Sequence, residues 1–222
     1  MNAYGTEDYI KFHERGTADM NTAEDEREYD IGNLKVAYKK YFCTRIIDGN
    51  ECNLETTLTT FFLDGKKICE YTCNEYFMKP YPYKYGGKRF VLFKKDLYGY
   101  TILNLETLEE YNYFPSDVLY PDNKNFGEAF IITDAIIFKD ILIFEGCYWG
   151  GPYEYWLLSL KDYKTYPLSI EKKIYNIKND GLIIDGSSVT ILAESQDKKD
   201  LTLNFSYEEL NTYLKLSKTY DI

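Results

Sequence analysis

The chain has 222 residues and a net charge of −10, with 45% hydrophobic, 28% charged and 18% aromatic residues. This composition lies within the range of soluble globular proteins and outside that of disordered chains. The acidic balance argues against direct binding of nucleic acid, because affinity for a phosphate backbone comes mainly from lysine and arginine.

The first 33 residues differ from the rest, because nine acidic residues face only three basic ones there, a net charge of −6. We expect residues 1–33 to be an acidic, mobile N-terminal arm, ahead of a single all-β domain over residues 34–222. Residues Thr22 to Glu28 predict the start of a short helix within the arm. Docking of its aromatic side chains onto the sheets would instead make the arm an additional strand or helix.

The start of the chain also bears on location. Residues Met1 to Arg15 lack the basic start and apolar run of a signal peptide, so we expect a cytoplasmic protein. The most apolar stretch, Ala129–Phe144, contains three charged residues and is too short to cross about 30 Å of hydrocarbon. We expect no association with a membrane.

From Leu34 onward, short runs of β-branched and aromatic residues alternate with turn dipeptides, which is typical of antiparallel sheet. Asp48-Gly49-Asn50 separates Val36–Ile47 from Leu54–Leu63, and Asp64-Gly65 separates that second run from Lys67–Phe77. The two tight turns predict a three-stranded meander.

Proline and glycine then interrupt the pattern at Pro80, Pro82 and Gly86-Gly87, where we expect a connection between two sheet units. Further strands are predicted beyond it. They are Arg89–Lys94, Tyr98–Leu105, Glu110–Phe114, Ala129–Phe138, Ile141–Glu145, Tyr155–Leu160 and Tyr163–Pro167.

The chain also contains an internal repeat. Tyr100–Pro115 parallels Tyr155–Pro167, and a weaker match sets Ala135–Phe144 against Gly181–Leu192. A repeat of about 45 to 55 residues with three or four strands is the spacing of propeller blades. We therefore predict antiparallel meanders in a propeller-like or incomplete propeller of about four units. A β-sandwich or an irregular multi-sheet assembly is the alternative.

Two segments support this fold by resemblance. Leu97-Tyr-Gly-Tyr-Thr-Ile-Leu-Asn-Leu-Glu106 and Phe144-Glu-Gly-Cys-Tyr-Trp-Gly-Gly-Pro-Tyr-Glu-Tyr155 resemble segments of uncharacterised, propeller-like bacterial proteins. The resemblance covers roughly residues 88–170 and implies a propeller-like fold. It carries no assigned activity.

A short helix is predicted near the C-terminus, over Tyr207–Leu216. Ser206 and Glu209 have the spacing of a capping box, and Leu210 and Leu214 lie on one helical face. A last strand is the alternative.

Five cysteines are present, an odd number that favours free thiols over a disulfide framework. Cys69 and Cys73 would lie about 13 Å apart on a strand, too far to share a metal ion. We expect buried structural thiols, no metal site and no cofactor.

Catalytic patterns are sparse. The single histidine, His13, lies in the acidic arm, and no nucleophile-elbow, P-loop or dinucleotide-binding motif occurs. Paired carboxylates remain as candidates, although turn chemistry explains the same positions. The candidates beside predicted strand ends are Asp96, Asp134, Asp140, Glu145, Glu154 and Asp185.

One hairpin tip, Glu145–Trp156, concentrates aromatic residues around Gly150-Gly151-Pro152. Tyrosine and tryptophan provide large contact areas with few rotatable bonds, so the tip is a candidate binding site. Its candidate binding residues are Tyr148, Trp149, Tyr153, Glu154 and Trp156. Alternatively, the two tryptophans fill the gap between neighbouring sheets.

The sequence thus favours a non-enzymatic binding protein, of inhibitor or immunity type, that engages a basic protein partner. Its net charge of −10 would speed encounter with such a partner. The alternatives are a small carboxylate-based hydrolase, and a scaffold or small-ligand module that uses the aromatic hairpin.

Overall fold

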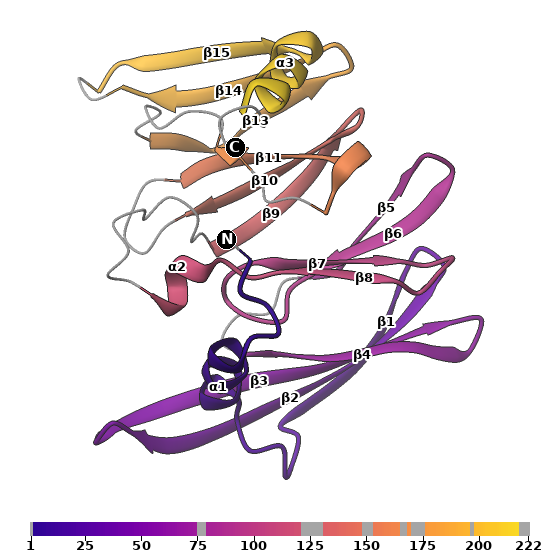
Figure 1. Cartoon of the computed structure of the whole chain (residues 1–222), viewed down its shortest axis with the longest axis vertical. Helices are drawn as coiled ribbons and strands as arrows, with labels where there is room; N and C mark the ends of the chain where they lie inside the picture. The colour runs from indigo at the N-terminus through magenta and orange to yellow at the C-terminus, as the bar shows by residue number, and fades with distance from the viewer. Residues whose placement is uncertain are drawn as a thin grey trace. The chain divides into compact units, whose positions relative to one another are not determined.

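Figure 1 shows the computed structural model of the chain, which divides into two compact units, Met1–Ala129 and Phe130–Ile222. Its strands form four small antiparallel sheets, so the predicted all-β class is confirmed. The boundary near residue 129 differs from the predicted single domain over residues 34–222. The structure describes residues 2–74, 79–120, 131–147, 153–164, 168–169, 176–195 and 198–217.

The first unit contains two four-stranded meanders, in which neighbouring strands follow chain order. The first sheet comprises β1 (Asp25–Ile31), β2 (Leu34–Ile47), β3 (Asn50–Leu63) and β4 (Lys66–Asn74). The second sheet comprises β5 (Tyr81–Tyr85), β6 (Lys88–Phe93), β7 (Tyr100–Asn104) and β8 (Glu110–Tyr113). Helices α1 (Glu7–Gly16) and α2 (Ser116–Leu119) complete the unit.

The hairpins of the first sheet form where the turn residues predicted them. The loop between β2 and β3 is Asp48-Gly49, with φ values of 51° and 81°. The loop between β3 and β4 is Asp64-Gly65, with φ values of 50° and 76°. Two successive positive φ values define the tight turn whose twist matches that of the flanking strands. The predicted three-stranded meander is confirmed, with β1 added at its edge.

The segment around Pro82 is a strand rather than the predicted connection. Pro82 lies in β5 and pairs with Val91, and Gly86-Gly87 forms the turn between β5 and β6. Because β5 is an edge strand of its sheet, a proline there need not break the ladder.

The two sheets of the first unit pack through their apolar faces. Phe61, Tyr71 and Phe93 meet at its centre, with ring centroids 4.2 to 5.6 Å apart. Burial of each such ring stabilises the unit by roughly 1.5–3 kcal/mol. The buried residues of this cluster are Ile31, Leu34, Val36, Phe61, Cys69, Tyr71, Cys73, Val91, Phe93, Leu103 and Leu105.

The acidic N-terminal segment is folded into the first unit as a helix and a strand. Helix α1 begins after Thr6, whose hydroxyl accepts a hydrogen bond from the Tyr9 amide at 3.2 Å. The helix predicted to start at Thr22 does not form, because residues 25–31 form β1 instead. Side chains along β1 alternate between exposed acids and the more buried Tyr29 and Ile31, which is the period of a strand. The arm therefore matches the docked alternative.

The second unit contains the other two sheets and a C-terminal helix. Its four-stranded sheet has the order β12-β11-β10-β9, and its three-stranded sheet the order β13-β14-β15. The elements are β9 (Ile131–Phe138), β10 (Ile141–Cys147), β11 (Tyr153–Ser159), the 3₁₀ turn η1 (Leu160–Asp162), β12 (Leu168–Ser169), β13 (Asn176–Asp185), β14 (Ser188–Glu194), β15 (Asp200–Ser206) and α3 (Tyr207–Ser217). Tyr163 lies in a turn, so a strand does not begin there as predicted.

The C-terminal helix forms as the capping box predicts. The Ser206 amide donates to Glu209 Oε2 at 2.7 Å, and the Glu209 amide donates to Ser206 Oγ at 3.2 Å. Leu210 and Leu214 of α3 are buried against the sheets of the unit. No helix among the described residues is long and apolar enough to span a membrane.

Replacing Ser206 with alanine should destabilise the second unit by about 1 kcal/mol, because the Glu209 amide loses its acceptor, Ser206 Oγ. Urea denaturation followed by tryptophan fluorescence measures this, since both tryptophans belong to residues 130–222. Thr202→Ala, at an exposed strand position outside the cap, is the control. Equal stability of the two variants would contradict the role of the cap.

The internal repeat corresponds to equivalent positions in two sheets. Tyr100–Pro115 supplies β7 and β8, the third and fourth strands of the second sheet, and Tyr155–Pro167 begins in β11, the third strand of the next. Leu105 donates its amide to Arg89 O at 2.9 Å, and Leu160 donates its amide to Asp140 O at 2.8 Å. Each leucine is buried and ties the end of a third strand to the start of the second.

Candidate functional site

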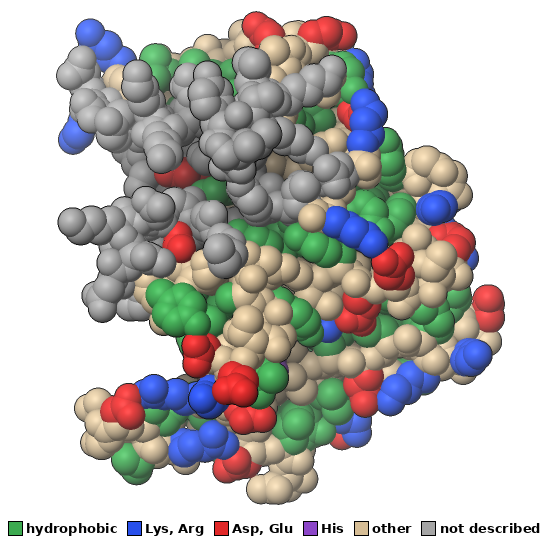
Figure 2. Space-filling model, viewed as in Figure 1, with side chains coloured by type: hydrophobic (Ala, Val, Ile, Leu, Met, Phe, Trp, Pro, Cys, Tyr) green, Lys and Arg blue, Asp and Glu red, His purple; other side chains and the backbone are tan. Residues whose placement is uncertain are grey.

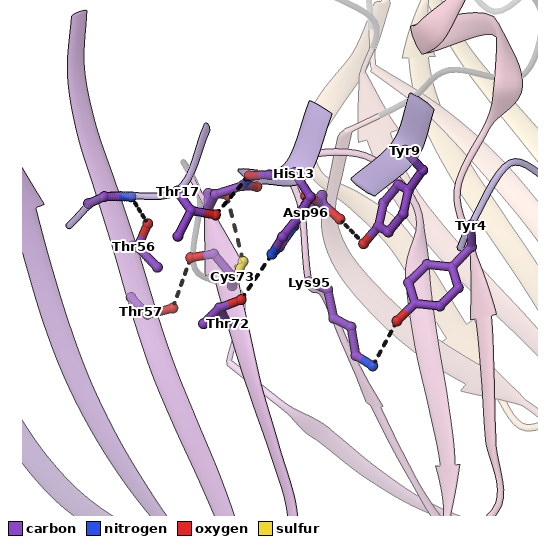
Figure 3. A network of polar contacts seen from close by, with 12 residues as sticks. Tyr4, Tyr9, His13, Thr17, Thr56, Thr57, Thr72, Cys73, Lys95 and Asp96 are labelled. Carbon is purple, nitrogen blue, oxygen red and sulfur yellow. Dashed lines mark hydrogen bonds and ion pairs between the residues drawn. The ribbon is translucent and has the colours of Figure 1, made fainter. Parts of the chain in front are cut away.

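A polar network lies where α1 contacts the first sheet (Figure 3). Tyr9 and His13 are four residues apart, so both side chains lie on the same face of α1. Both reach Asp96, which lies in the segment that follows β6. The network therefore connects α1 with the ends of two different sheets.

The carboxylate of Asp96 is the centre of this network. His13 Nδ1 lies 2.6 Å from Asp96 Oδ1, and the Tyr9 hydroxyl donates to Asp96 Oδ2 at 2.7 Å. The Asp96 side chain is only 2% exposed and that of His13 is 20% exposed. Burial, together with the adjacent negative charge, raises the pKa of Tyr9 far above its ordinary value, so its hydroxyl stays a donor.

The end of α1 is held by further hydrogen bonds from the sheet. The His13 carbonyl accepts from the Asn74 amide group at 3.0 Å and from the Thr17 hydroxyl at 2.7 Å. The Ala18 amide donates to Thr56 Oγ1 at 2.7 Å. These contacts satisfy backbone groups that a helix end leaves without partners. Helix α1 is thus attached to β3 and β4 at several points.

His13 also lies 2.9 Å from Thr72 Oγ1 through Nε2, which completes a chain of carboxylate, imidazole and hydroxyl. This order of groups occurs where an enzyme activates a hydroxyl nucleophile. In this chain the same contacts attach α1 to β4, and this structural role explains the placement of the carboxylate, the imidazole and the hydroxyl. Sequence reasoning set His13 aside because it placed the residue in a mobile arm; the signal it missed is the helical spacing of Tyr9 and His13.

A second polar group surrounds Glu110 on β8. Lys95 Nζ lies 2.8 Å from Glu110 Oε2, and the Cys69 thiol donates to Glu110 Oε1 at 3.1 Å. Lys95 also donates to the Tyr4 hydroxyl at 3.2 Å. Burial, with the neighbouring carboxylate, raises the pKa of Cys69 to about 12, so this thiol stays protonated and unreactive.

Acid should weaken the first unit as Glu110 titrates. Burial alone would raise the pKa of Glu110, but the hydrogen bond and charge of Lys95 hold it below its ordinary value. Such a carboxyl stabilises the fold above its unfolded pKa of about 4.3, and this contribution is lost as pH falls through the lower folded value. We expect Glu110→Gln to cost about 1 kcal/mol at neutral pH, and to show a smaller loss of stability on acidification than the native chain.

Urea denaturation at a series of acidic pH values, followed by circular dichroism, tests this expectation. Glu51→Gln, at an exposed position on β3, is the matched control and should keep the pH dependence of the native chain. The same pH dependence in Glu110→Gln as in the native chain would show that the pair contributes nothing.

A cleft of about 530 Å³ lies between α1 and the hairpin of β2 and β3. Its walls are mostly apolar, with Arg15, Asn53 and Asn74 as the lining residues that have polar side chains. The Arg15 guanidinium is ion-paired with Asp48. The lining residues are Phe12, Arg15, Gly16, Ile47, Cys52, Asn53, Leu54 and Asn74.

The second unit has a smaller hollow, of about 190 Å³, that brings two of the candidate carboxylates together. Asp134 and Glu145 are cross-strand neighbours on β9 and β10, and both line the hollow. Tyr155 donates its hydroxyl to Glu145 Oε2 at 3.3 Å. Like charges in direct opposition destabilise a sheet, so the fold alone does not favour this pair. Among the described carboxylates, Asp134 and Glu145 therefore best fit a site for carboxylate chemistry.

The other candidate carboxylates have structural contacts. Asp140 pairs with Lys161 at 2.5 Å, and Asp185 accepts hydrogen bonds from Ser187 and Ser188 in a turn. Glu154 lies opposite Gly146 on β11, and Asp96 holds Tyr9 and His13. Turn chemistry and helix docking therefore account for most of the acids that the sequence singled out.

The predicted aromatic binding residues are described only in part. Tyr148 and Trp149 lie outside the described residues, and Tyr153 begins β11. Glu154 is half-buried, and Trp156 is 8% exposed and lies opposite Phe144. Trp156 is therefore largely shielded from solvent within the second unit.

The acidic surface of the first unit comes from its N-terminal segment. Of the nine acids in residues 1–33, eight are exposed and Asp25 is half-buried. Residues 34–129 hold thirteen acidic and thirteen basic residues, so the segment carries the whole charge excess of the unit. Figure 2 shows acidic side chains at the surface, interspersed with lysine and arginine.

Comparison with known proteins gives no family for this chain. No protein-family model matches it, and no curated protein matches its sequence. Among solved structures, the catalytic domain of the GH62 α-L-arabinofuranosidase of Coprinopsis cinerea matches at a TM-score of 0.34 and 10% identity, over 85% of this chain and 67% of that chain. A match at this level establishes neither a shared fold nor a shared activity.

Proposed function

We propose that the protein is a non-enzymatic binding protein, of inhibitor or immunity type, which engages a basic protein partner through the acidic surface of its first unit. The observation that carries the proposal is the placement of charge. The whole net charge of −6 of that unit comes from residues 1–33, and eight of their nine acids are exposed on α1, β1 and the segments beside them. Charge concentrated on ordered elements presents carboxylates in fixed positions to a partner.

Electrostatic steering gives this proposal a measurable signature. Exposed carboxylates speed encounter with a basic protein at low ionic strength, and salt screens the effect beyond a Debye length of about 8 Å at physiological ionic strength. The association rate should therefore fall as salt is raised, while the dissociation rate changes less.

The test uses proteins captured on the full chain from the source cell and then purified. We expect a basic protein that rebinds the purified chain, with an association rate that falls about tenfold or more between low and physiological ionic strength. A variant in which Glu7, Glu14 and Asp19 are replaced by their amides should bind more slowly. The control variant has the same number of exposed acids, Glu51, Asp64 and Glu208, replaced by their amides. Failure of every captured basic protein to rebind would overturn the proposal.

A second function is favoured by the hollow at Asp134 and Glu145. Two carboxylates at one site are the minimum apparatus for glycoside hydrolysis, one as acid and the other as nucleophile or base. Hydrolysis of a panel of nitrophenyl glycosides, reduced at least about 100-fold in both Asp134→Asn and Glu145→Gln, would support it. Absence of hydrolysis by the native chain would remove this candidate.

We propose for the fold that the four meanders are blades of an incomplete propeller. Support comes from the meander order in every sheet and from the equivalent positions of the repeated segments. The face of the first sheet that points away from the second carries the ion pairs Lys39–Glu26 and Lys35–Glu28, which suits a terminal blade facing solvent. An experimental structure without a regular rotation between successive sheets would contradict this arrangement.

A further inference from the structure

We propose that the free edge of β1 binds an extended, basic segment of the partner, which pairs with it as an additional strand. This inference rests on the proposed function, because it specifies how the acidic surface would hold a basic protein. Addition of a strand to an exposed sheet edge is a common mode of peptide recognition, in which backbone hydrogen bonds give affinity and alternate side chains give specificity.

Among the described strands, β1 has a paired neighbour on one side only. It is the outermost strand in the order β1-β2-β3-β4, and β2 is its neighbour along the whole length of Asp25–Ile31. Six of its seven residues are exposed or half-buried. A strand at the edge of a sheet presents a row of N–H and C=O groups with which another chain can pair.

The register of the hairpin shows which backbone groups face outward. Ile31 and Leu34 flank the two-residue loop Gly32-Asn33 and therefore form the hydrogen-bonded pair that closes it. Because hydrogen-bonded and non-hydrogen-bonded positions alternate, the amides and carbonyls of Glu26, Glu28 and Asp30 point away from β2. These three residues would form the ladder with an added strand.

The same three residues carry the charge of the edge. Their side chains are exposed and share one face of the sheet, whereas Tyr29 and Ile31 pack on the opposite face. Lys39 and Lys35 of β2 reach Glu26 and Glu28 at 2.9 and 2.7 Å, in exposed pairs that contribute about 0–1 kcal/mol each. A lysine or arginine at alternate positions of an added strand would approach the carboxylates from the open side.

Charge also selects among possible strands. A row of carboxylates repels a second copy of β1, which protects the protein from pairing with itself. It attracts a strand with basic residues at every second position. The edge therefore discriminates by sign of charge, and the occupant we propose is a basic extended segment of a partner protein.

The test uses a fluorescent peptide of alternating lysine and threonine as the probe, with the full chain, and measures binding by fluorescence anisotropy. Glu28→Pro removes an amide that points outward, while Glu28→Gln removes the same charge and keeps the amide. Proline is tolerated at an edge position whose amide faces solvent, so β1 should still pair with β2. We expect Glu28→Gln to weaken binding about twofold and Glu28→Pro at least about tenfold.

A second probe keeps the test decisive if Glu28→Pro does not fold. The same peptide, N-methylated at every residue, retains its charge but has no backbone N–H to donate along either edge, and it should bind the native chain at least about tenfold more weakly. Equal binding of both peptides, or of Glu28→Pro and Glu28→Gln, overturns the edge proposal. If a captured basic protein binds the native chain, Glu28→Gln and Glu28→Pro equally well, the proposed function stands without this edge. If the native chain binds no basic protein, the proposed function itself fails.

Discussion

Replacing Asp96 with alanine should lower the stability of the first unit by about 3 kcal/mol, a large part of the stability of a domain of this size. The carboxylate is 2% exposed and holds both the Tyr9 hydroxyl and His13 Nδ1. Its removal leaves a buried hydroxyl without its acceptor and deprives His13 of its charged partner. Asp96→Asn keeps an acceptor oxygen, so we expect a smaller loss of about 1–2 kcal/mol.

Two measurements check this prediction. Urea denaturation gives the loss of stability, with Glu51→Ala, at an exposed position on β3, as the control that should change stability by less than about 0.5 kcal/mol. Because His13 is the single histidine of the chain, its imidazole resonance reports whether α1 remains docked. A chain with Asp96→Ala that keeps native stability and an unchanged His13 resonance would show that the network does not hold the helix.

Gly99→Ala should also destabilise the first unit, by about 3 kcal/mol or more. Gly99 has a φ of +75°, and a Cβ atom there would lie 2.1 Å from the carbonyl oxygen of Tyr113. The backbone of β8 must move to admit a methyl group, and Gly99 ends the segment that carries Lys95 and Asp96. The substitution therefore combines backbone strain with displacement of the network.

Gly87 provides a closely matched control. Its φ is also +75°, but a Cβ atom at this position meets nothing within 4 Å. Gly87→Ala should cost only the strain of the left-handed backbone, about 1 kcal/mol. Thermal denaturation of the two variants separates the clash from the strain, and similar melting temperatures would contradict the close approach at Gly99.

Local signals in the sequence predicted much of the fold. The Asp-Gly turns, the strand runs around them and the capping box at Ser206 each depend on a few neighbouring residues, and each forms as expected. The connection predicted around Pro82 was wrong, because the sequence does not reveal that this segment forms a strand at the edge of a sheet. The helix at Thr22 was wrong because pairing with β2 outweighs a favourable N-terminal charge pattern.

The candidate site depends on contacts between distant segments, which local patterns do not reveal. His13 and Asp96 are 83 residues apart, and Asp134 and Glu145 converge only because of the register of β9 and β10. The acidic composition of residues 1–33 favoured a mobile arm, whereas the docked alternative depended on aromatic side chains that include Tyr9 and Phe12. Those aromatic side chains pack with Phe114, at ring-centroid distances of 4.9 and 5.4 Å, and attach the segment to the unit.

We propose that a basic partner binds the acidic N-terminal part of the first unit. The most direct test is a titration of the isotope-labelled full chain with its captured and purified basic partner, followed by amide chemical shifts. We expect chemical-shift changes concentrated at residues of β1, with the largest at Glu26, Glu28 and Asp30. Shifts concentrated at residues 145–156, or at Asp134 and Glu145, would contradict it and favour the aromatic hairpin or the carboxylate hollow instead.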